Sequence, residues 1–279
     1  MNLNNWGWNT SLEDKFTIYK EQGLIPGRIV TESRHIYEVE TETGRYKAKV
    51  SGHFMYTAIN RADYPTIGDW TALRIEGDMA IIEKRLERSS SFSRKRAGIE
   101  VEEQVIAANI NQIFLVFGLD GGRNFSKGAL ERFLTRAWDS GAEPVIVLNK
   151  CDISTNAEEI LLDAETVAVG TPIHITSAVT QQGIEDLKSY LKPGKTIAFT
   201  GFSGVGKSAL INKLCGKDMM KTGKQREYDL KGKHTTTEKK LFQLSGGGIL
   251  IDSPGIKELQ LWGDEESLSF SFEDITKFS

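Results

Sequence analysis

One octapeptide constrains the fold of this chain more than any other part of it. Residues 201–208 read GFSGVGKS and match the phosphate-loop pattern GxxxxGK[ST] at every fixed position. An apolar run precedes them at 196–200, and the apolar spacing over 209–215 is that of a helix. The stretch therefore predicts a strand, a phosphate-binding loop and a helix in direct succession, in preference to an ordinary glycine-rich turn.

The predicted loop supplies the positive potential that a polyphosphate needs. Glycines let the backbone approach phosphate oxygens, and the turned amides and the helix N-terminus carry partial positive charge. Lys207 adds a full charge near the outer phosphates, and the hydroxyl of Ser208 is a candidate magnesium ligand. The residues expected to contact the nucleotide are Gly201, Phe202, Ser203, Gly204, Val205, Gly206, Lys207, Ser208 and Ala209.

Composition limits the class of protein. With 279 residues, 39% of them hydrophobic, the chain can bury a sizeable core, which favours two domains. The formal net charge of -3 gives no overall attraction to nucleic acid, so such a contact needs a local basic patch. Because no long apolar run and no signal-peptide pattern occur, we expect a cytoplasmic protein without membrane contact. Cys151 and Cys215 belong to no metal-binding pattern and are expected to be buried, reduced thiols.

The first third of the chain has the texture of a small β-barrel. Residues 1–25, which include Trp6 and Trp8, are expected to cap it. Five short strands in close succession favour an OB-type barrel over residues 26–83, with an SH3-like barrel as the alternative. The predicted strands, separated by turn signals, are 28–30, 35–39, 45–50, 70–75 and 79–82.

A basic segment follows the predicted barrel. Residues 84–98, KRLERSSSFSRKRAG, combine basic residues with a serine cluster and show almost no apolar periodicity. This pattern predicts a mobile linker. Its function stays open between a solvated hinge with no specific role and an electrostatic contact with RNA phosphates.

From residue 99 to residue 265, apolar strands alternate with helical patterns. Such alternation predicts an α/β domain whose mostly parallel sheet is covered on both faces. The predicted helices are 126–140, 157–166, 183–191 and 208–216, and the predicted strands are 112–117, 144–148, 172–175, 195–199, 238–244 and 248–251.

The tetrapeptide Asn149-Lys150-Cys151-Asp152 follows the strand 144–148, at the end where open α/β sheets bind ligands. The Asp152 carboxylate can accept two hydrogen bonds from the ring N–H and the exocyclic amine of guanine, which adenine does not offer in that arrangement. Asn149 would support the loop and the other edge of the base, and the stem of Lys150 would cover the ring. Alone, the tetrapeptide would indicate a turn, but beside a phosphate loop it favours guanine.

Two further segments can serve the phosphates. Residues 252–255, DSPG, follow a predicted strand, so that Asp252 could hold magnesium through water and the Gly255 amide could approach the terminal phosphate. Between this segment and the loop lies GKHTTT at 232–237, where Thr235 or Thr236 could complete the magnesium shell. The alternative for the threonine run is simple β propensity.

Taken together, the motifs resemble the five sequence boxes of a GTPase in an unusual order. NKCD and the triplet Thr176-Ser177-Ala178 precede the phosphate loop, whereas GKHTTT and DSPG follow it. This circular permutation, behind a β-barrel, resembles the ribosome-small-subunit-dependent GTPases of the RsgA (YjeQ/YloQ) family. Shorter stretches that agree are Pro26-Gly27-Arg28, Gly68-Asp69-Trp70, Arg96-Ala97-Gly98 and residues 104–109, QVIAAN.

The resemblance implies a function and a set of site residues. It implies magnesium-dependent GTP hydrolysis stimulated by the small ribosomal subunit, a role in late maturation of that subunit, and a barrel that contacts rRNA. We also expect a monomer. The implied guanine site is Asn149, Lys150 and Asp152 closed by Ser177 and Ala178, and the implied magnesium ligands are Ser208, Thr235 or Thr236, and Asp252.

The chain departs from common GTPases after Gly255. Ile256 stands where many GTPases place a water-orienting glutamine, which an isoleucine cannot replace. The RsgA family shares this substitution, which implies slow intrinsic turnover. We therefore take His234, beside the threonines, as the candidate that positions water, with a solvated loop histidine as the alternative.

The resemblance also raises the question of a zinc domain. Family members continue into a C-terminal zinc domain with a Cys/His cluster, and this sequence shows no such ligands before Ser279. We expect residues 266–279 to begin that region in a fragment; a member that lacks the domain is the alternative.

Two other functions remain as alternatives. One is a GTP-gated rRNA-binding assembly factor in which hydrolysis is secondary. The other, an ATP-dependent enzyme, depends on the phosphate loop alone.

Overall fold

The predicted barrel forms from five short strands that pack buried residues toward one centre. The computed structural model describes residues 2–33, 36–96, 102–121, 124–216, 239–244, 246–253 and 256. Strand β1 pairs with β2 and with β4, and β3 lies parallel to β5, which closes the barrel in the order β1-β2-β3-β5-β4. This order, with helix α2 (Gly52–Thr57) between β3 and β4, is the OB arrangement. The strands are β1 (Ile25–Ser33), β2 (Ile36–Thr41), β3 (Gly44–Val50), β4 (Trp70–Glu76) and β5 (Met79–Arg85).

The N-terminal residues pack against the barrel. Helix η1 (Leu3–Trp6) and helix α1 (Thr10–Lys20) precede β1, and the Asn9 side chain caps α1 by accepting a hydrogen bond from the Leu12 amide at 3.1 Å. The ring of Trp8 meets Trp70 of the barrel edge-on, with 4.8 Å between ring centroids. Apolar burial therefore holds this segment in place.

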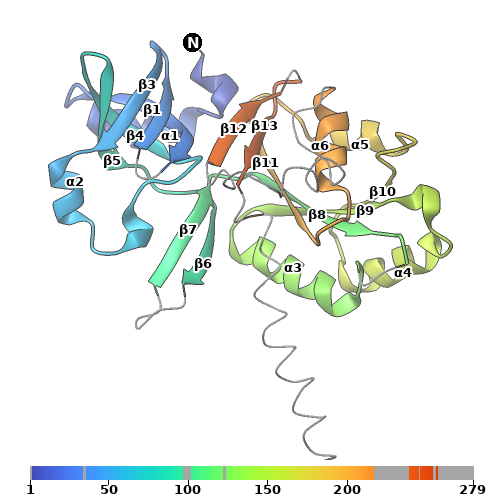
Figure 1. The fold of residues 1–279 in the computed structure, drawn as a ribbon. Helices are drawn as coiled ribbons and strands as arrows, with labels where there is room; N and C mark the ends of the chain where they lie inside the picture. The colour runs from blue at the N-terminus through green and yellow to red at the C-terminus, as the bar shows by residue number, and fades with distance from the viewer. Residues whose placement is uncertain are drawn as a thin grey trace, which may run out of the picture.

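The interpretation of residues 84–98 as a mobile linker is wrong for residues 84–85, which end β5, and for residues 91–96. Residues Ser91–Arg96 form strand β6, which pairs antiparallel with β7 (Glu102–Ala108) and projects between the barrel and the α/β part (Figure 1). Phe92 is only 3% exposed and contributes to the same core as Ile106 of β7. A strand with a single apolar residue shows no periodicity, so its pairing depends on β7.

The second part of the chain is the predicted α/β domain. Its sheet has the order β10-β9-β8-β11-β13-β12, parallel throughout except for β12. Helices α3 and α4 cover one face, and α5 and α6 cover the other, each with its own apolar core (Figure 1). The strands are β8 (Gln112–Gly118), β9 (Glu143–Asn149), β10 (Ile173–Thr176), β11 (Thr196–Gly201), β12 (Lys239–Gln243) and β13 (Ile249–Asp252); the helices are α3 (Lys127–Asp139), η3 (Cys151–Ile153), α4 (Ala157–Val167), α5 (Ile184–Lys188) and α6 (Lys207–Cys215), with a short η2 (Arg61–Asp63) in the barrel.

Strand β12 joins the two parts into one continuous sheet, which the sequence did not predict. It pairs antiparallel with β13 on one side and with barrel strand β1 on the other, where Glu32 lies opposite Lys239. The Lys239 ammonium donates to both carboxylate oxygens of Glu32 at 2.9 Å and to the hydroxyl of Thr66 at 3.1 Å. The pair is mostly buried, so water and salt weaken it less than a surface pair.

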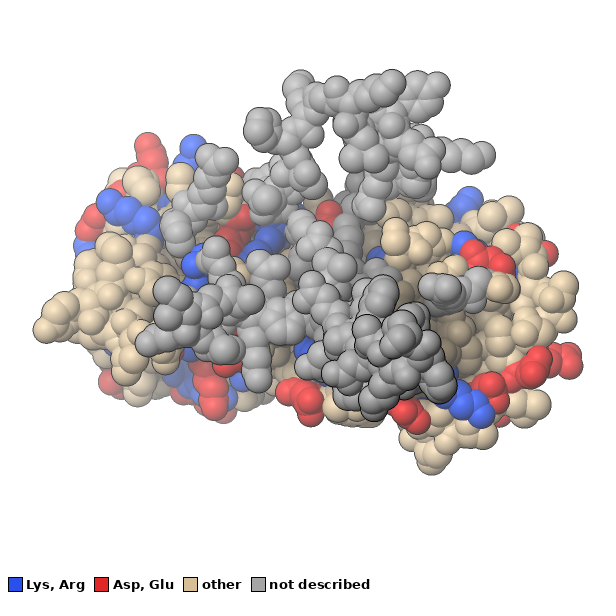
Figure 2. Space-filling model, turned by 60° about the horizontal axis from the view of Figure 1, so that its bottom comes forward, with Lys and Arg blue, Asp and Glu red and all other residues tan. Residues whose placement is uncertain are grey.

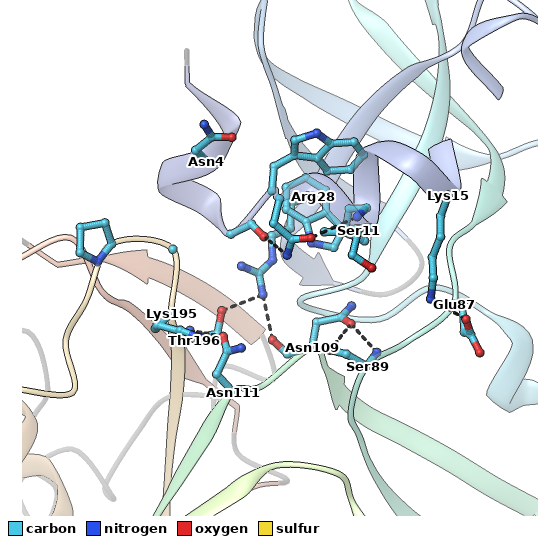
Figure 3. Close-up of a pocket in the computed structure, with 17 residues that line it drawn as sticks. Asn4, Ser11, Lys15, Arg28, Glu87, Ser89, Asn109, Asn111, Lys195 and Thr196 are labelled. Atoms are coloured by element: carbon cyan, nitrogen blue, oxygen red, sulfur yellow. Dashed lines mark hydrogen bonds and ion pairs between the residues drawn. The ribbon is translucent and has the colours of Figure 1, made fainter. Parts of the chain in front are cut away.

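A buried arginine forms a second junction. Arg28 of β1 is 1% exposed; its guanidinium donates to the carbonyl oxygens of Trp6, Gly68 and Asn109 and, at 2.8 Å, to the Thr196 hydroxyl (Figure 3). Burial lowers the pKa of Arg28 to about 9, so it remains charged at neutral pH. One side chain thus connects the N-terminal segment, the barrel, the end of β7 and the start of β11.

We expect Arg28→Met to lower the free energy of unfolding by about 3 kcal/mol, because the buried carbonyl oxygen of Trp6 and the part-buried one of Asn109 lose the hydrogen bonds that Arg28 donates. Urea unfolding followed by tryptophan fluorescence measures this change. Arg74→Met is the matched control: Arg74 is half exposed and pairs with Glu83 on the surface, so its loss should cost less than about 1 kcal/mol. An equal effect of the two substitutions would contradict the junction role of Arg28.

Candidate functional site

The predicted motifs meet at one edge of the α/β sheet. The parallel strands β10, β9, β8, β11 and β13 are neighbours, so their carboxyl ends line up. These strands end at Thr176, Asn149, Gly118, Gly201 and Asp252. The NKCD, TSA and DSPG segments therefore begin beside the phosphate loop although they lie far apart in the sequence.

The phosphate loop joins β11 to α6 in the predicted way. Gly201 has φ +140°, and a Cβ atom there would lie 2.1 Å from the carbonyl oxygen of Val116 on β8. Only glycine fits this close approach of two strands. Val205 is fully buried, and the ring of Phe202 packs edge-on against Phe133 at 5.7 Å between centroids. The loop is thus anchored in both cores, while Ser203 and Gly204 are exposed to solvent.

Lys207 begins helix α6 and reaches back across the loop. Its ammonium donates to the carbonyl oxygens of Gly201 at 2.5 Å and Phe202 at 2.7 Å. Ser208 and Ala209 follow in the first turn and are half-buried. The helix N-terminus, its amides and a lysine charge therefore lie together at the loop, as anion binding requires.

Asn149 ties three loops together. It is 1% exposed, and its side-chain amide donates to the carbonyl oxygen of Val205 at 2.8 Å. Its side-chain oxygen accepts from the Thr176 hydroxyl at 3.2 Å and from the Ala178 amide at 3.3 Å. The NKCD loop (149–152), the TSA turn (176–178) and the phosphate loop are consequently joined by one buried side chain.

The TSA turn is stabilised by its own serine. The buried Ser177 hydroxyl accepts hydrogen bonds from the amides of Val179 and Thr180, and the Ser177 amide donates to the carbonyl oxygen of Gln182 at 3.0 Å. The turn thus holds the Ala178 amide toward Asn149.

One residue beside the NKCD loop, Asp120, was not predicted from the sequence. Lys150 adopts a left-handed backbone with φ +70°, and its ammonium pairs with Asp120, which follows β8. The bonds from Lys150 and from Asn124 lower the pKa of Asp120. The available signal was the position of Asp120 just beyond a predicted strand of the same sheet, next to the strand that carries NKCD.

Asp152 and Cys151 lie in η3, immediately after Lys150. Asp152 is exposed, which leaves its carboxylate accessible to a ligand. Cys151 is half-buried rather than buried, and its thiol lies 3.4 Å from the side-chain oxygen of Gln182. Burial, together with the nearby Asp152 charge, raises the pKa of Cys151. Cys215 is buried as expected, and neither cysteine forms a disulfide.

The metal side of the predicted site is described in part. Ser208 at the start of α6 and Asp252 at the end of β13 offer oxygen ligands, which suit Mg²⁺. His234, Thr235, Thr236 and Gly255 lie outside the described residues. Ile256 is 1% exposed, and its apolar side chain has no group that could orient water; its carbonyl oxygen accepts from the Thr200 hydroxyl at 2.9 Å.

A cavity of about 280 Å³ lies at the opposite end of β11 (Figure 3). Arg28, Trp70, Lys195 and Thr196 line it, together with the surface pair of Lys15 and Glu87. It contains none of the predicted nucleotide contacts. The candidate site is therefore defined by the chemistry at the carboxyl ends of the strands and not by this cavity.

Two other features are absent from the described residues, a metal cluster and a membrane-spanning helix. Within the ranges given above, no three His, Cys, Asp or Glu side chains gather as a metal cluster. In the same part of the chain, no helix has the length and apolarity needed to cross a bilayer.

A matched pair of glycine substitutions tests the contact between Asn149 and the loop. Gly204 and Gly206 both have positive φ, but only a Cβ at Gly206 would meet the Asn149 side-chain nitrogen, at 2.3 Å, whereas Gly204 has open space around it. Both alanine variants carry backbone strain of about 1 kcal/mol. We expect Gly206→Ala to weaken GDP binding at least tenfold more than Gly204→Ala, measured by titration calorimetry. Equal losses would show that the loop does not depend on Asn149.

The chain is similar to known proteins over nearly its whole length. Residues 85–262 match the family model described as RsgA GTPase. The small ribosomal subunit biogenesis GTPase RsgA 1 of Oceanobacillus iheyensis is 38% identical over 99% of this chain and 78% of the relative. The RsgA 2 protein of the same description from Lactiplantibacillus plantarum is 42% identical over 97% of this chain and 76% of the relative.

Two crystal structures resemble the fold. YjeQ from Thermotoga maritima matches with a TM-score of 0.66 and 29% identity, over 85% of this chain and 77% of the other. YloQ, described as a circularly permuted GTPase, matches with a TM-score of 0.59 and 23% identity, over 86% of this chain and 74% of the other.

Proposed function

Because the chain belongs to the RsgA GTPase family, we propose that it hydrolyses GTP to GDP and phosphate during biogenesis of the small ribosomal subunit. One observation carries the proposal: buried Asn149 joins the NKCD, TSA and phosphate-loop segments into a single site in permuted order. The names of the relatives support the role in small-subunit biogenesis.

GTP binding divides into a base side and a phosphate side. On the base side, the exposed Asp152 carboxylate would accept from the ring N–H and the amine of guanine, beside Lys150 and the Ser177–Ala178 turn. On the phosphate side, the loop amides and Lys207 would bind the β- and γ-phosphates. The ammonium would then exchange the carbonyl oxygens of Gly201 and Phe202 for phosphate oxygens.

Hydrolysis requires charge neutralisation and a positioned water. Ser208 and Asp252 would hold Mg²⁺ with Thr235 or Thr236, and the ion, when bound, neutralises charge on the phosphates. His234 is proposed to orient the attacking water, and the Gly255 amide to contact the terminal phosphate. The apolar, buried Ile256 cannot take the glutamine role, which supports slow turnover without a partner.

The proposed partner is the small ribosomal subunit, with rRNA as the contacted component. Figure 2 shows Lys and Arg interspersed with Asp and Glu over the described part of one face, so overall charge does not define the contact. Support comes from the OB-type barrel and from the basic sequence of residues 84–96, which leads from β5 into β6. We propose a monomer that acts in the cytoplasm.

Phosphate release with and without purified small subunits tests the activity. We expect small subunits to raise the rate of phosphate release at least tenfold. Lys207→Ala should abolish the stimulated rate, because it removes the positive charge that would neutralise the phosphates. Lys213→Ala, an exposed lysine later in the same helix, is the control and should retain it. GTP binding without stimulated hydrolysis would instead favour the GTP-gated assembly factor.

Base selectivity is tested at Asp152. We expect Asp152→Asn to weaken GTP binding about a hundredfold and to improve binding of xanthosine triphosphate, because the amide can donate to the xanthine oxygen that replaces the guanine amine. Competition assays with GTP, xanthosine triphosphate and ATP measure the selectivity. Equal binding of ATP and GTP by the unmodified protein, unchanged in Asp152→Asn, would overturn guanine recognition and favour the ATP-dependent enzyme.

A further inference from the structure

We propose that Asp120 is a positioning residue for the guanine nucleotide: it holds the Lys150 ammonium, so that the stem of Lys150 is already in place when the base binds. The inference rests on the proposed function and extends it to a residue outside the NKCD, TSA and phosphate-loop segments.

Backbone pairing places the two side chains together. Strands β8 and β9 are parallel neighbours, and Gly118 lies opposite Asn149 at their carboxyl ends. The Leu119 amide then donates to the Asn149 carbonyl oxygen at 2.8 Å, which continues the contact past the end of β8. Asp120 follows Leu119, and Lys150 follows Asn149, so the pairing of the two strands brings Asp120 and Lys150 together.

The Asp120 carboxylate is restrained on both oxygens. One oxygen accepts from the Lys150 ammonium, and the other accepts from the Asn124 side-chain amide at 2.8 Å. A Cβ atom on Gly118 would lie 2.8 Å from the second oxygen and 3.3 Å from Asn124 Cβ. The arrangement thus depends on a missing side chain at Gly118, and it leaves Asp120 little freedom.

Lys150 combines an unusual backbone conformation with a side chain whose freedom is restricted. Its left-handed backbone, φ +70° and ψ +35°, is uncommon for a residue with a side chain, and such outliers concentrate at binding sites. A lysine stem samples many rotamers, and freezing them when a ligand binds reduces affinity. The side chains of Lys150 and Asp120 are 26% and 21% exposed, so their attraction is only partly screened. The ion pair therefore orders the Lys150 side chain before the ligand binds, so that less conformational entropy is lost on binding.

Titration calorimetry with GDP tests the inference. We expect Asp120→Asn, which keeps the shape and removes the charge, to weaken GDP binding roughly fivefold. Asp163→Asn is the matched control, because Asp163 forms an ion pair with Lys127 at 2.8 Å between α4 and α3, belongs to none of the NKCD, TSA and phosphate-loop segments, and should leave the affinity unchanged.

A double-mutant cycle shows whether Asp120 acts through Lys150. Lys150→Met retains most of the stem and removes the ammonium. In that background, Asp120→Asn should cause no further loss, whereas a general structural role of Asp120 would lower the affinity in both backgrounds. Because the stem would cover the ring and not the exocyclic amine, Asp120→Asn should weaken the binding of GDP and of inosine diphosphate by the same factor.

A second variant, Asn124→Ala, tests the other contact of the Asp120 carboxylate, so that the proposal does not depend on the folding of one variant. Asn124→Ala leaves the ion pair in place but frees the other carboxylate oxygen, so a smaller loss of affinity, about twofold, is expected. If the unmodified protein does not prefer GDP to ADP, the proposed function fails. If it does, and Asp120→Asn binds GDP as tightly or the two substitutions are additive, only the role of Asp120 is overturned.

Discussion

Strand β1 belongs to two structures at once, and the architecture depends on this sharing. Its pairing with β2 and β4 closes the barrel, while its pairing with β12 extends the α/β sheet into the barrel wall. Arg28 adds a buried contact from the same strand to β11. A break in β1 would therefore open the barrel and detach it from the nucleotide-binding domain together.

The site is assembled by backbone geometry more than by an enclosing cavity. Gly201 permits close contact between β11 and β8, and Asn149 fixes the loops at the ends of three strands. Because all these groups stand at carboxyl ends of parallel strands, their spatial order does not depend on their order along the chain. This independence explains how a permuted sequence can build the same kind of site.

Much of this could be predicted from the sequence, where local patterns are strong. Apolar runs located the strands of the barrel and of the α/β sheet, and glycine spacing located the phosphate loop. What was missed lacks a local signature. Phe92 alone does not mark β6 as a strand, Lys239 does not reveal that β12 pairs with the barrel, and Asp120 gains meaning only beside Lys150. Each of these depends on a partner distant in sequence.

The pairing of β1, β12 and β13 has a mechanical consequence. Thr31 of the barrel lies opposite Lys240, and Lys240 lies opposite Asp252, so one ladder row runs from the barrel wall to the acid at the phosphate side. Two strand spacings separate its ends, about 10 Å. Because β12 is hydrogen-bonded to both neighbours, a displacement of β1 would pass to the strand of Asp252 through only two ladders. The barrel is thus connected to the strand of Asp252 by a continuous hydrogen-bonded ladder.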